Sequence, residues 1–138
     1  MTTPPNPTTT APTISPTSLL PLLPTPSLLL IDVRRTDYEG GAIHGSLNLP
    51  AQSFYANRSV LYDLCKRAGV RRVVFYCGSS NGRGPRCAAW FAEYIDERQD
   101  GEMVALTLEG GIKGWVKAGE AYTQCVDGYE AGHWKQFD

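Results

Sequence analysis

Residues 73–87 place the strongest constraint on what this chain can fold into. The stretch reads Val-Val-Phe-Tyr-Cys-Gly-Ser-Ser-Asn-Gly-Arg-Gly-Pro-Arg-Cys. Its β-branched and aromatic start predicts a buried strand, and the Gly and Ser residues that follow predict a loop. Pro85 suits the first position of a helix, where the N–H group that proline lacks would have no helical partner. The rest of the chain must supply the scaffold for this strand–loop–helix unit.

Two further apolar runs, 27–33 and 103–108, predict strands that are covered on both faces, as in a parallel sheet. A short strand is expected within residues 42–50, ending at its proline. Residues 17–24 fit a short helix and a proline-rich tether equally well. Helical spacing of apolar residues predicts the remaining elements, which are helices over 60–69, 85–97 and 112–119. Strands that alternate with helices predict an α/β fold with a small, mainly parallel sheet flanked by helices.

The chain has 138 residues, a length that suits one domain. We assign residues 14–138 to that domain and residues 1–13 to a flexible Thr- and Pro-rich leader with too few apolar side chains to order itself. A formal net charge of −1 indicates no general attraction to nucleic acid or to a membrane surface. No apolar run approaches the roughly 20 residues of a membrane span. Four cysteines without a secretory signal pattern indicate free thiols in a reducing compartment, so we expect a cytoplasmic protein and allow for the nucleus as well.

The loop after residue 76 has the composition of an anion-binding site. It starts at the carboxyl end of a predicted parallel strand, the edge at which such sheets bind ligands. Small residues allow successive backbone N–H groups to turn inward toward an anion, and a helix N-terminus adds positive charge. This environment favours a thiolate at Cys77, and the guanidinium of Arg83 is shaped to hold two oxygens of the anion. The predicted oxyanion-binding residues of the loop are Gly78, Ser79, Ser80, Asn81, Gly82 and Gly84.

Each loop residue also has a simpler interpretation. A cysteine at the end of a buried strand is often only a small core residue. A glycine-rich turn before a helix can bind phosphate without catalysing anything. Cys77 at the start of the loop and Arg83 at its end, without a Gly-Lys-Ser/Thr sequence, favour catalysis.

Three motifs resemble a known superfamily. Cys77-x5-Arg83 followed by Gly84-Pro85-Arg86 resembles the active loop of the rhodanese-fold cell-division-cycle phosphatases and of the related eukaryotic arsenate reductases. Residues 30–34 and 37–50 resemble the first rhodanese signature, and residues 109–115 resemble the last one. The resemblance covers about residues 27–119 and implies a rhodanese-like domain. Sulfurtransferases of this fold have a loop one residue shorter, so the longer loop implies room for phosphate or arsenate.

Two positions depart from the phosphatase pattern. The resemblance implies an acidic residue before the loop arginine and a rescue cysteine in the first signature, but this chain has Gly82 and Val33 there. A phosphatase must protonate its leaving group, so the general acid would come from outside the loop. The candidates near strand ends are Glu109, Asp37 and Glu39.

The uncharged loop favours an arsenate reductase, in which arsenate adds to Cys77 and an external thiol, glutathione or glutaredoxin, reduces the adduct. The alternative is a tyrosine- or dual-specificity-type phosphatase, acting on a protein or a small molecule through a phosphocysteine. Further alternatives are a thiosulfate or persulfide sulfurtransferase and a non-catalytic binding module. The expected partner is therefore a small oxyanion or a phosphoprotein, and we expect a monomer or weak dimer.

The remaining cysteines and histidines carry weaker predictions. The cysteines lack a Cys-x-x-Cys pair and a nearby histidine, so we expect no metal site and no bound cofactor. Cys65 and Cys87 have core spacing, with a resolving thiol as the alternative for Cys87. The sequence assigns no role to Cys125. Arg34, Arg35 and Arg86 are expected to add positive field around the anion, and His44 and His133 to serve surface or hydrogen-bonding roles.

Overall fold

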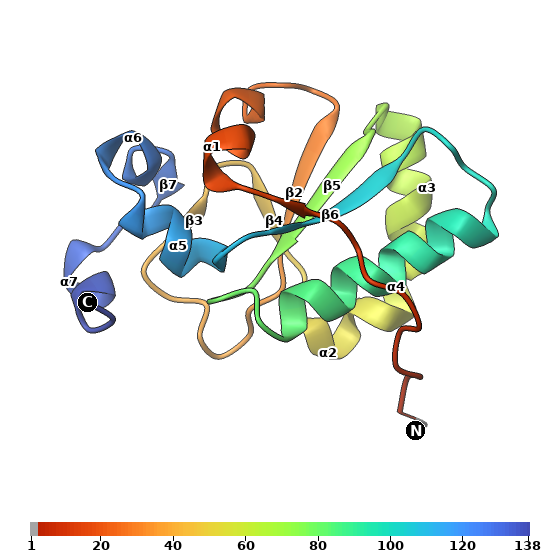
Figure 1. Ribbon diagram of the computed structural model, residues 1–138, viewed down its shortest axis with the longest axis horizontal. Helices are drawn as coiled ribbons and strands as arrows, with labels where there is room; N and C mark the ends of the chain where they lie inside the picture. The colour runs from red at the N-terminus through yellow and green to blue at the C-terminus, as the bar shows by residue number, and fades with distance from the viewer. Residues whose placement is uncertain (1–2) are drawn as a thin grey trace.

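A five-stranded parallel sheet forms the centre of the computed structural model, which describes residues 3–138 (Figure 1). The strand order is β1-β6-β5-β2-β4, and every neighbouring pair is parallel. The strands are β1 (Thr13–Ile14), β2 (Leu28–Asp32), β4 (Ser46–Asn48), β5 (Arg72–Tyr76) and β6 (Val104–Leu108). The predicted mainly parallel α/β fold is confirmed, with the strand that precedes the loop at the centre.

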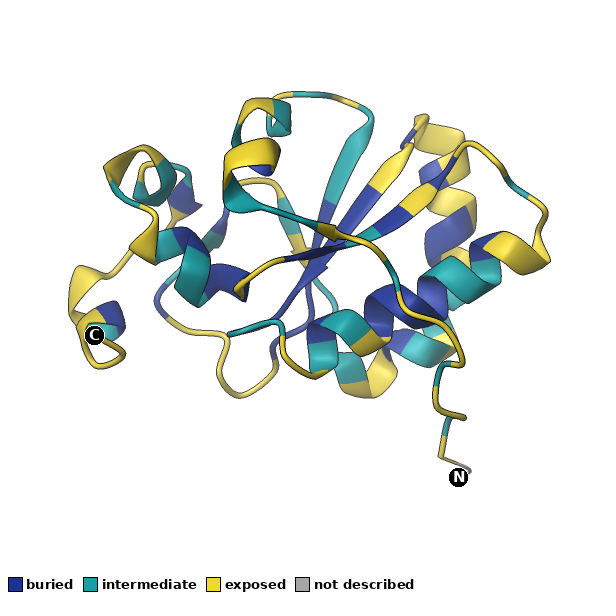
Figure 2. Ribbon diagram, viewed as in Figure 1, coloured by how far each residue is buried: buried dark blue, intermediate teal, exposed yellow. Residues whose placement is uncertain are grey.

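Helices cover both faces of the sheet, which explains why its three central strands, β2, β5 and β6, are mainly apolar. On one face, Ile31 and Phe75 pack with residues from α2 (Ala51–Phe54), α3 (Arg58–Ala68) and α4 (Arg83–Glu97). On the other, Leu30 and Val74 pack with Leu19, Trp115 and Trp134 from three further helices. Those are α1 (Pro16–Leu19), α5 (Gly111–Lys117) and α7 (Ala131–Lys135); α6 (Glu120–Thr123) lies between the last two in sequence. Figure 2 shows the buried strands and the buried inner side of α4.

Several shorter elements differ from the expected ones. Residues 42–50 form two strands, because Gly45, with φ +85°, turns the chain between β3 (Ala42–Ile43) and β4. β3 leaves the main sheet and pairs antiparallel with β7 (Val126–Asp127). Residues 16–22 are helical: Ser15 caps α1, and a 3₁₀ turn (Leu20–Leu22) follows it. A second 3₁₀ turn (Tyr55–Asn57) joins α2 to α3. Among residues 3–138, no helix has the length and apolarity needed to cross a bilayer.

The Thr- and Pro-rich leader lies against the domain over residues 3–13, the part that the structure describes (Figure 1). The indole Nε1 of Trp90 donates to the carbonyl of Pro5 at 2.8 Å, and the Thr8 N–H donates to Glu93 Oε1 at 2.6 Å. Thr13 and Ile14 pair with β6. An extended segment has unpaired backbone groups, and here α4 and β6 supply partners for some of them. The division between leader and domain stays a prediction.

Candidate active site

The loop that carries Cys77 joins the central strand to the longest helix. Cys77 follows β5 directly, and α4 begins at Arg83, two residues before the predicted start. Pro85 is therefore the third residue of the helix, where its lack of an N–H group still removes no helical bond. The sulfur lies at the carboxyl end of a parallel strand and beside the N-terminus of a 15-residue helix.

Two backbone N–H groups donate to the sulfur of Cys77. The Ser80 nitrogen lies 3.2 Å from Sγ and the Gly84 nitrogen lies 3.4 Å from it. Ser80 adopts a left-handed φ of +58°, which turns the loop back toward the cysteine. A side chain on Gly84 would place its Cβ 3.3 Å from the Cys77 nitrogen, so glycine permits this close approach. The sulfur therefore accepts two backbone N–H groups beside the N-terminus of α4.

The predicted loop residues differ in burial. Cys77, Gly78 and Gly84 are buried, and Cys77 is only 2% exposed. Ser79 and Ser80 are half-buried, while Asn81 and Gly82 are exposed on the outer turn. Whether the six predicted residues bind an oxyanion stays a prediction.

Arg83, the predicted clamp, is paired with Asp37. Its Nη1 donates to Oδ1 at 2.8 Å and its Nη2 donates to Oδ2 at 2.6 Å. The hydrogen bonds from Arg83 lower the pKa of Asp37 to about 2, and the same pairing raises the pKa of Arg83. In this arrangement Asp37 is a carboxylate at neutral pH and has no proton to donate.

Arg34 holds the segment that carries Asp37. Its guanidinium is 1% exposed and binds the carboxylate of Asp32 at 2.7 Å. It also donates to the carbonyls of Asp37, Glu39 and Gly41, at 3.3, 3.0 and 2.7 Å. This charge is buried and paired with that of Asp32, which offsets part of the positive field that the sequence predicted from Arg34.

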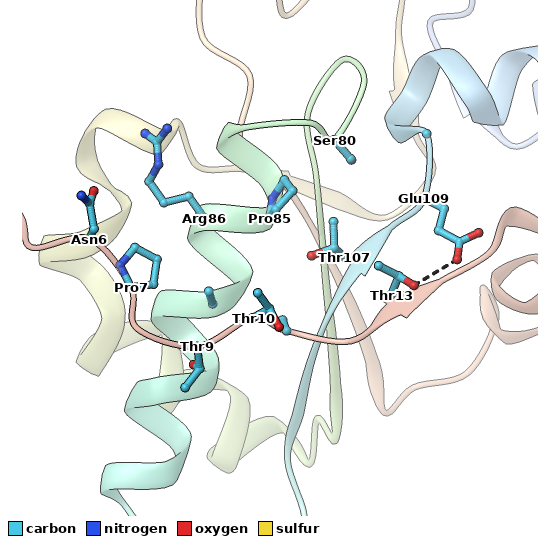
Figure 3. Close-up of a pocket in the computed structure, with 13 residues that line it drawn as sticks. Asn6, Pro7, Thr9, Thr10, Thr13, Ser80, Pro85, Arg86, Thr107 and Glu109 are labelled. Atoms are coloured by element: carbon cyan, nitrogen blue, oxygen red, sulfur yellow. Dashed lines mark hydrogen bonds between the residues drawn. The ribbon is translucent and has the colours of Figure 1, made fainter.

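The other two candidate acids make contacts away from the sulfur. Glu109 follows β6, and its Oε1 accepts from Thr13 Oγ1 at 3.0 Å (Figure 3). The Glu39 side chain is 67% exposed and lies 3.8 Å from Nδ1 of His133. Within residues 3–138, no hydrogen bond joins Asp37, Glu39 or Glu109 to Cys77. A general-acid role for any of them stays a prediction.

The start of α5 supports the loop from the other side. The N–H groups of Ile112 and Lys113 donate to the carbonyls of Cys77 and Gly78, at 3.1 and 3.0 Å. Gly111 has φ +59°, and a Cβ there would lie 2.5 Å from the Cys77 oxygen. The glycines of the last signature therefore let the backbone of α5 contact the backbone of the loop that starts at Cys77. Lys113, which the sequence pattern left unassigned, brings a positively charged side chain to this contact.

Two hollows flank the loop. The larger, about 550 Å³, lies between the N-terminal segment, α4 and the end of β6, and Ser80, Arg86 and Glu109 line it (Figure 3). The smaller, about 380 Å³, is lined by Asp37 and Gly78 of the site and by Lys113, His133, Trp134 and Phe137. The docked C-terminal aromatics therefore form one wall beside the loop.

Two of the other cysteines, Cys65 and Cys87, lie in the core. Burial raises the pKa of Cys87 to about 12 and that of Cys65 to about 11, so both are protonated at neutral pH. Cys125 is half-buried, and its thiol donates to the Ala121 carbonyl at 3.6 Å. In the described part of the chain, no cluster of three or more His, Cys, Asp or Glu side chains is arranged to hold a metal ion.

Comparison with known protein families assigns the chain to a family that agrees with this fold. The family model of the rhodanese-like domain matches residues 15–118. The chain belongs to the rhodanese-like family. This assignment confirms the resemblance carried by the three sequence motifs and accounts for the single parallel sheet with helices on both faces.

Relatives within the family include both predicted kinds of enzyme. The chain is 36% identical over 118 residues to the dual specificity phosphatase Cdc25 of Arabidopsis thaliana, covering 83% of this chain and 79% of that protein. It is 32% identical over 117 residues to arsenate reductase 2.2 of Oryza sativa subsp. japonica, covering 83% and 88%. The solved structure of an As-Sb reductase from Leishmania major has the same fold, with a TM-score of 0.75, 24% identity and 84% of each chain covered. The similarities favour neither activity over the other.

Proposed function

We propose that this protein is a cysteine-dependent oxyanion enzyme that acts as an arsenate reductase. The observation that carries the choice is the loop from Cys77 to Arg83, which contains no acidic side chain to protonate a leaving group. In the resting site Asp37, paired with Arg83 at 2.6 and 2.8 Å, is ionised, with a pKa of about 2. Hydrolysis of a phosphate ester needs a proton for its leaving group, whereas arsenate reduction releases water and needs no strong acid.

In the proposed reaction, Cys77 acts first and an external thiol acts second. The Cys77 thiolate bonds to arsenic, and an arsenate oxygen takes up protons and leaves as water. A glutathione thiol then attacks the Cys77 sulfur, and the electron pair of the S–As bond stays on arsenic, which is reduced from +5 to +3. Arsenite leaves, a Cys77–glutathione disulfide remains, and a second thiol, from glutathione or glutaredoxin, reduces it. The backbone N–H groups of the loop and Arg83 hold the negative oxygens throughout.

A phosphatase is the second candidate, favoured by the identity to the Arabidopsis dual specificity phosphatase. In that reaction Cys77 would accept the phosphoryl group, and water would then hydrolyse the phosphocysteine. An acid from outside the loop would have to protonate the leaving alcohol. If Arg83 turns to the phosphoryl group, Asp37 loses the partner that lowers its pKa and becomes the nearest candidate.

One purified sample separates the functions. Initial rates are measured with arsenate and glutathione, with an aryl phosphate, and with thiosulfate and cyanide. The proposal expects arsenite release, abolished in Cys77→Ser and retained in Cys125→Ser, which alters a half-buried thiol in another part of the fold. Aryl phosphate hydrolysis without arsenite release would show the phosphatase instead. Thiocyanate formation alone would show sulfur transfer, and activity that survives Cys77→Ser would refute the site.

A further inference from the structure

The carboxylate of Asp37 lines the same hollow as Gly78 of the loop and is paired with Arg83. It takes both terminal nitrogens of Arg83, the last residue of the loop segment that begins at Cys77. Its Oδ2 is also 3.7 Å from the point where a Cβ on Gly78 would stand, at the first residue after Cys77. The carboxylate is therefore bound to the arginine at one end of the loop and lies near the glycine at its other end, where Cys77 is 2% exposed.

The position of this carboxylate is set by the fold. Arg34, buried and bonded to Asp32, donates to the Asp37 carbonyl at 3.3 Å and to two later carbonyls of the same segment. The Arg35 N–H donates to Asp37 Oδ1 at 3.3 Å, which fixes the side chain to its own turn. A freely moving surface acid would lose more conformational entropy on pairing with Arg83 than this held residue does.

A carboxylate presents two negative oxygens to a guanidinium in the same way as a tetrahedral oxyanion does. The two donors that Asp37 occupies cannot hold an incoming anion at the same time. An arsenate or a phosphate ester that uses these donors must first replace Asp37, and its measured affinity is reduced by the fraction of molecules in which the pair is closed.

We propose that Asp37 is a built-in competitor, an autoinhibitory contact that keeps the resting site closed until an oxyanion displaces it from Arg83. The inference rests on the proposed function, because it takes the loop to be the oxyanion site. It assigns Asp37 a role different from that of a general acid: the residue sets how much free anion is needed to occupy the loop, and it limits access to the thiol.

The test measures the loop without turnover. Cys77 is alkylated with iodoacetamide, a neutral reagent, and the modified peptide is quantified by mass spectrometry as inorganic phosphate is titrated in. Asp37→Asn removes the charge and keeps an oxygen for the Arg35 N–H, and Asp37→Ala removes the contact completely. Glu39→Gln is the matched control, since it removes the same charge from the same segment without touching Arg83.

Both Asp37 variants are expected to be alkylated faster without phosphate. In both variants, the phosphate concentration that halves the rate of Cys77 alkylation should be about fivefold lower than in the wild type. This is the change in affinity expected when a partly exposed ion pair no longer competes. Glu39→Gln should change the alkylation rate without phosphate, and the half-protecting phosphate concentration, by less than about twofold. Weaker or unchanged protection in the Asp37 variants would refute the competitor role alone, as would an equal effect of Glu39→Gln. Absence of protection in every form would refute the oxyanion site and this inference with it.

Discussion

Replacement of Gly111 by alanine tests how strongly the loop that starts at Cys77 depends on the start of α5. Gly111 has φ +59°, and a Cβ there would lie 2.5 Å from the Cys77 carbonyl oxygen and 2.6 Å from that of Gly78. Ordinary contacts begin near 3.4 Å, so the loop carbonyls would have to move by about 0.9 Å. The neighbouring Gly110→Ala is a matched control: its φ is +75°, but its Cβ would meet Gly114 of α5 at 3.2 Å.

Both variants force alanine into the left-handed region, at a cost of about 1–2 kcal/mol, which lowers Tm by about 5 °C in a protein of this size. Only Gly111→Ala would also displace the backbone of Cys77, the proposed nucleophile. A misplacement near 1 Å costs about 100-fold in rate, so arsenite release should fall by about that factor. Gly110→Ala should retain its rate within about threefold.

The assay is initial-rate arsenite formation at a temperature well below both melting transitions, together with the rate of Cys77 alkylation. Circular dichroism melting curves confirm that both variants are folded. Equal activity losses in the two variants would refute the argument that Gly111 acts through contact with the loop, because backbone strain alone would then explain both results.

Three further predictions follow from the site and its support. Replacement of the buried Arg34 by Met should lower the free energy of unfolding in urea by about 3–5 kcal/mol, since it leaves the buried carboxylate of Asp32 without its partner. The exposed Arg35→Met should lower it by under about 0.5 kcal/mol, and similar values for the two variants would contradict this reasoning. Iodoacetamide should label Cys77 in the native protein and leave Cys87 unlabelled until urea is added, because burial raises the pKa of Cys87 to about 12. Labelling of Cys87 before urea is added would refute its core position. The pKa of Asp37 is about 2 in the folded protein and about 3.9 in the unfolded chain. The pair with Arg83 therefore stabilises the fold above about pH 4, and this stabilisation is lost as the pH falls toward 2. Because Asp37 is half-exposed, Asp37→Asn should lower Tm by only about 1–2 °C at pH 6 and by less at pH 2; an equal loss at both values would disprove the linkage.

The central strands and the loop could be predicted because their signals are local. Three apolar runs gave parallel strands, and Cys77 and Arg83 stand at the two ends of one short glycine-rich segment. Even the helix start was missed by only two residues, since Pro85 is equally acceptable at the first and third helical positions. These features depend on residues that are neighbours in the sequence.

The pairing of Arg83 with Asp37 joins residues 46 positions apart and follows no periodic pattern. Arg34 has the composition of a surface cation, yet its five N–H donors satisfy one carboxylate and several carbonyls inside the fold. The pairing of Thr13 and Ile14 with β6 is a backbone contact, which composition alone does not predict.

The short outer strands of the sheet have a consequence for solubility. A long free strand edge offers unpaired backbone groups to other molecules and promotes aggregation, and proteins commonly limit this with short edges and prolines. Here β1 has two residues and follows Pro12, while β4 has three and ends shortly before Pro50. Removal of the first 14 residues would leave the five-residue edge of β6 open. The Thr- and Pro-rich segment thus also shields the sheet from intermolecular strand pairing.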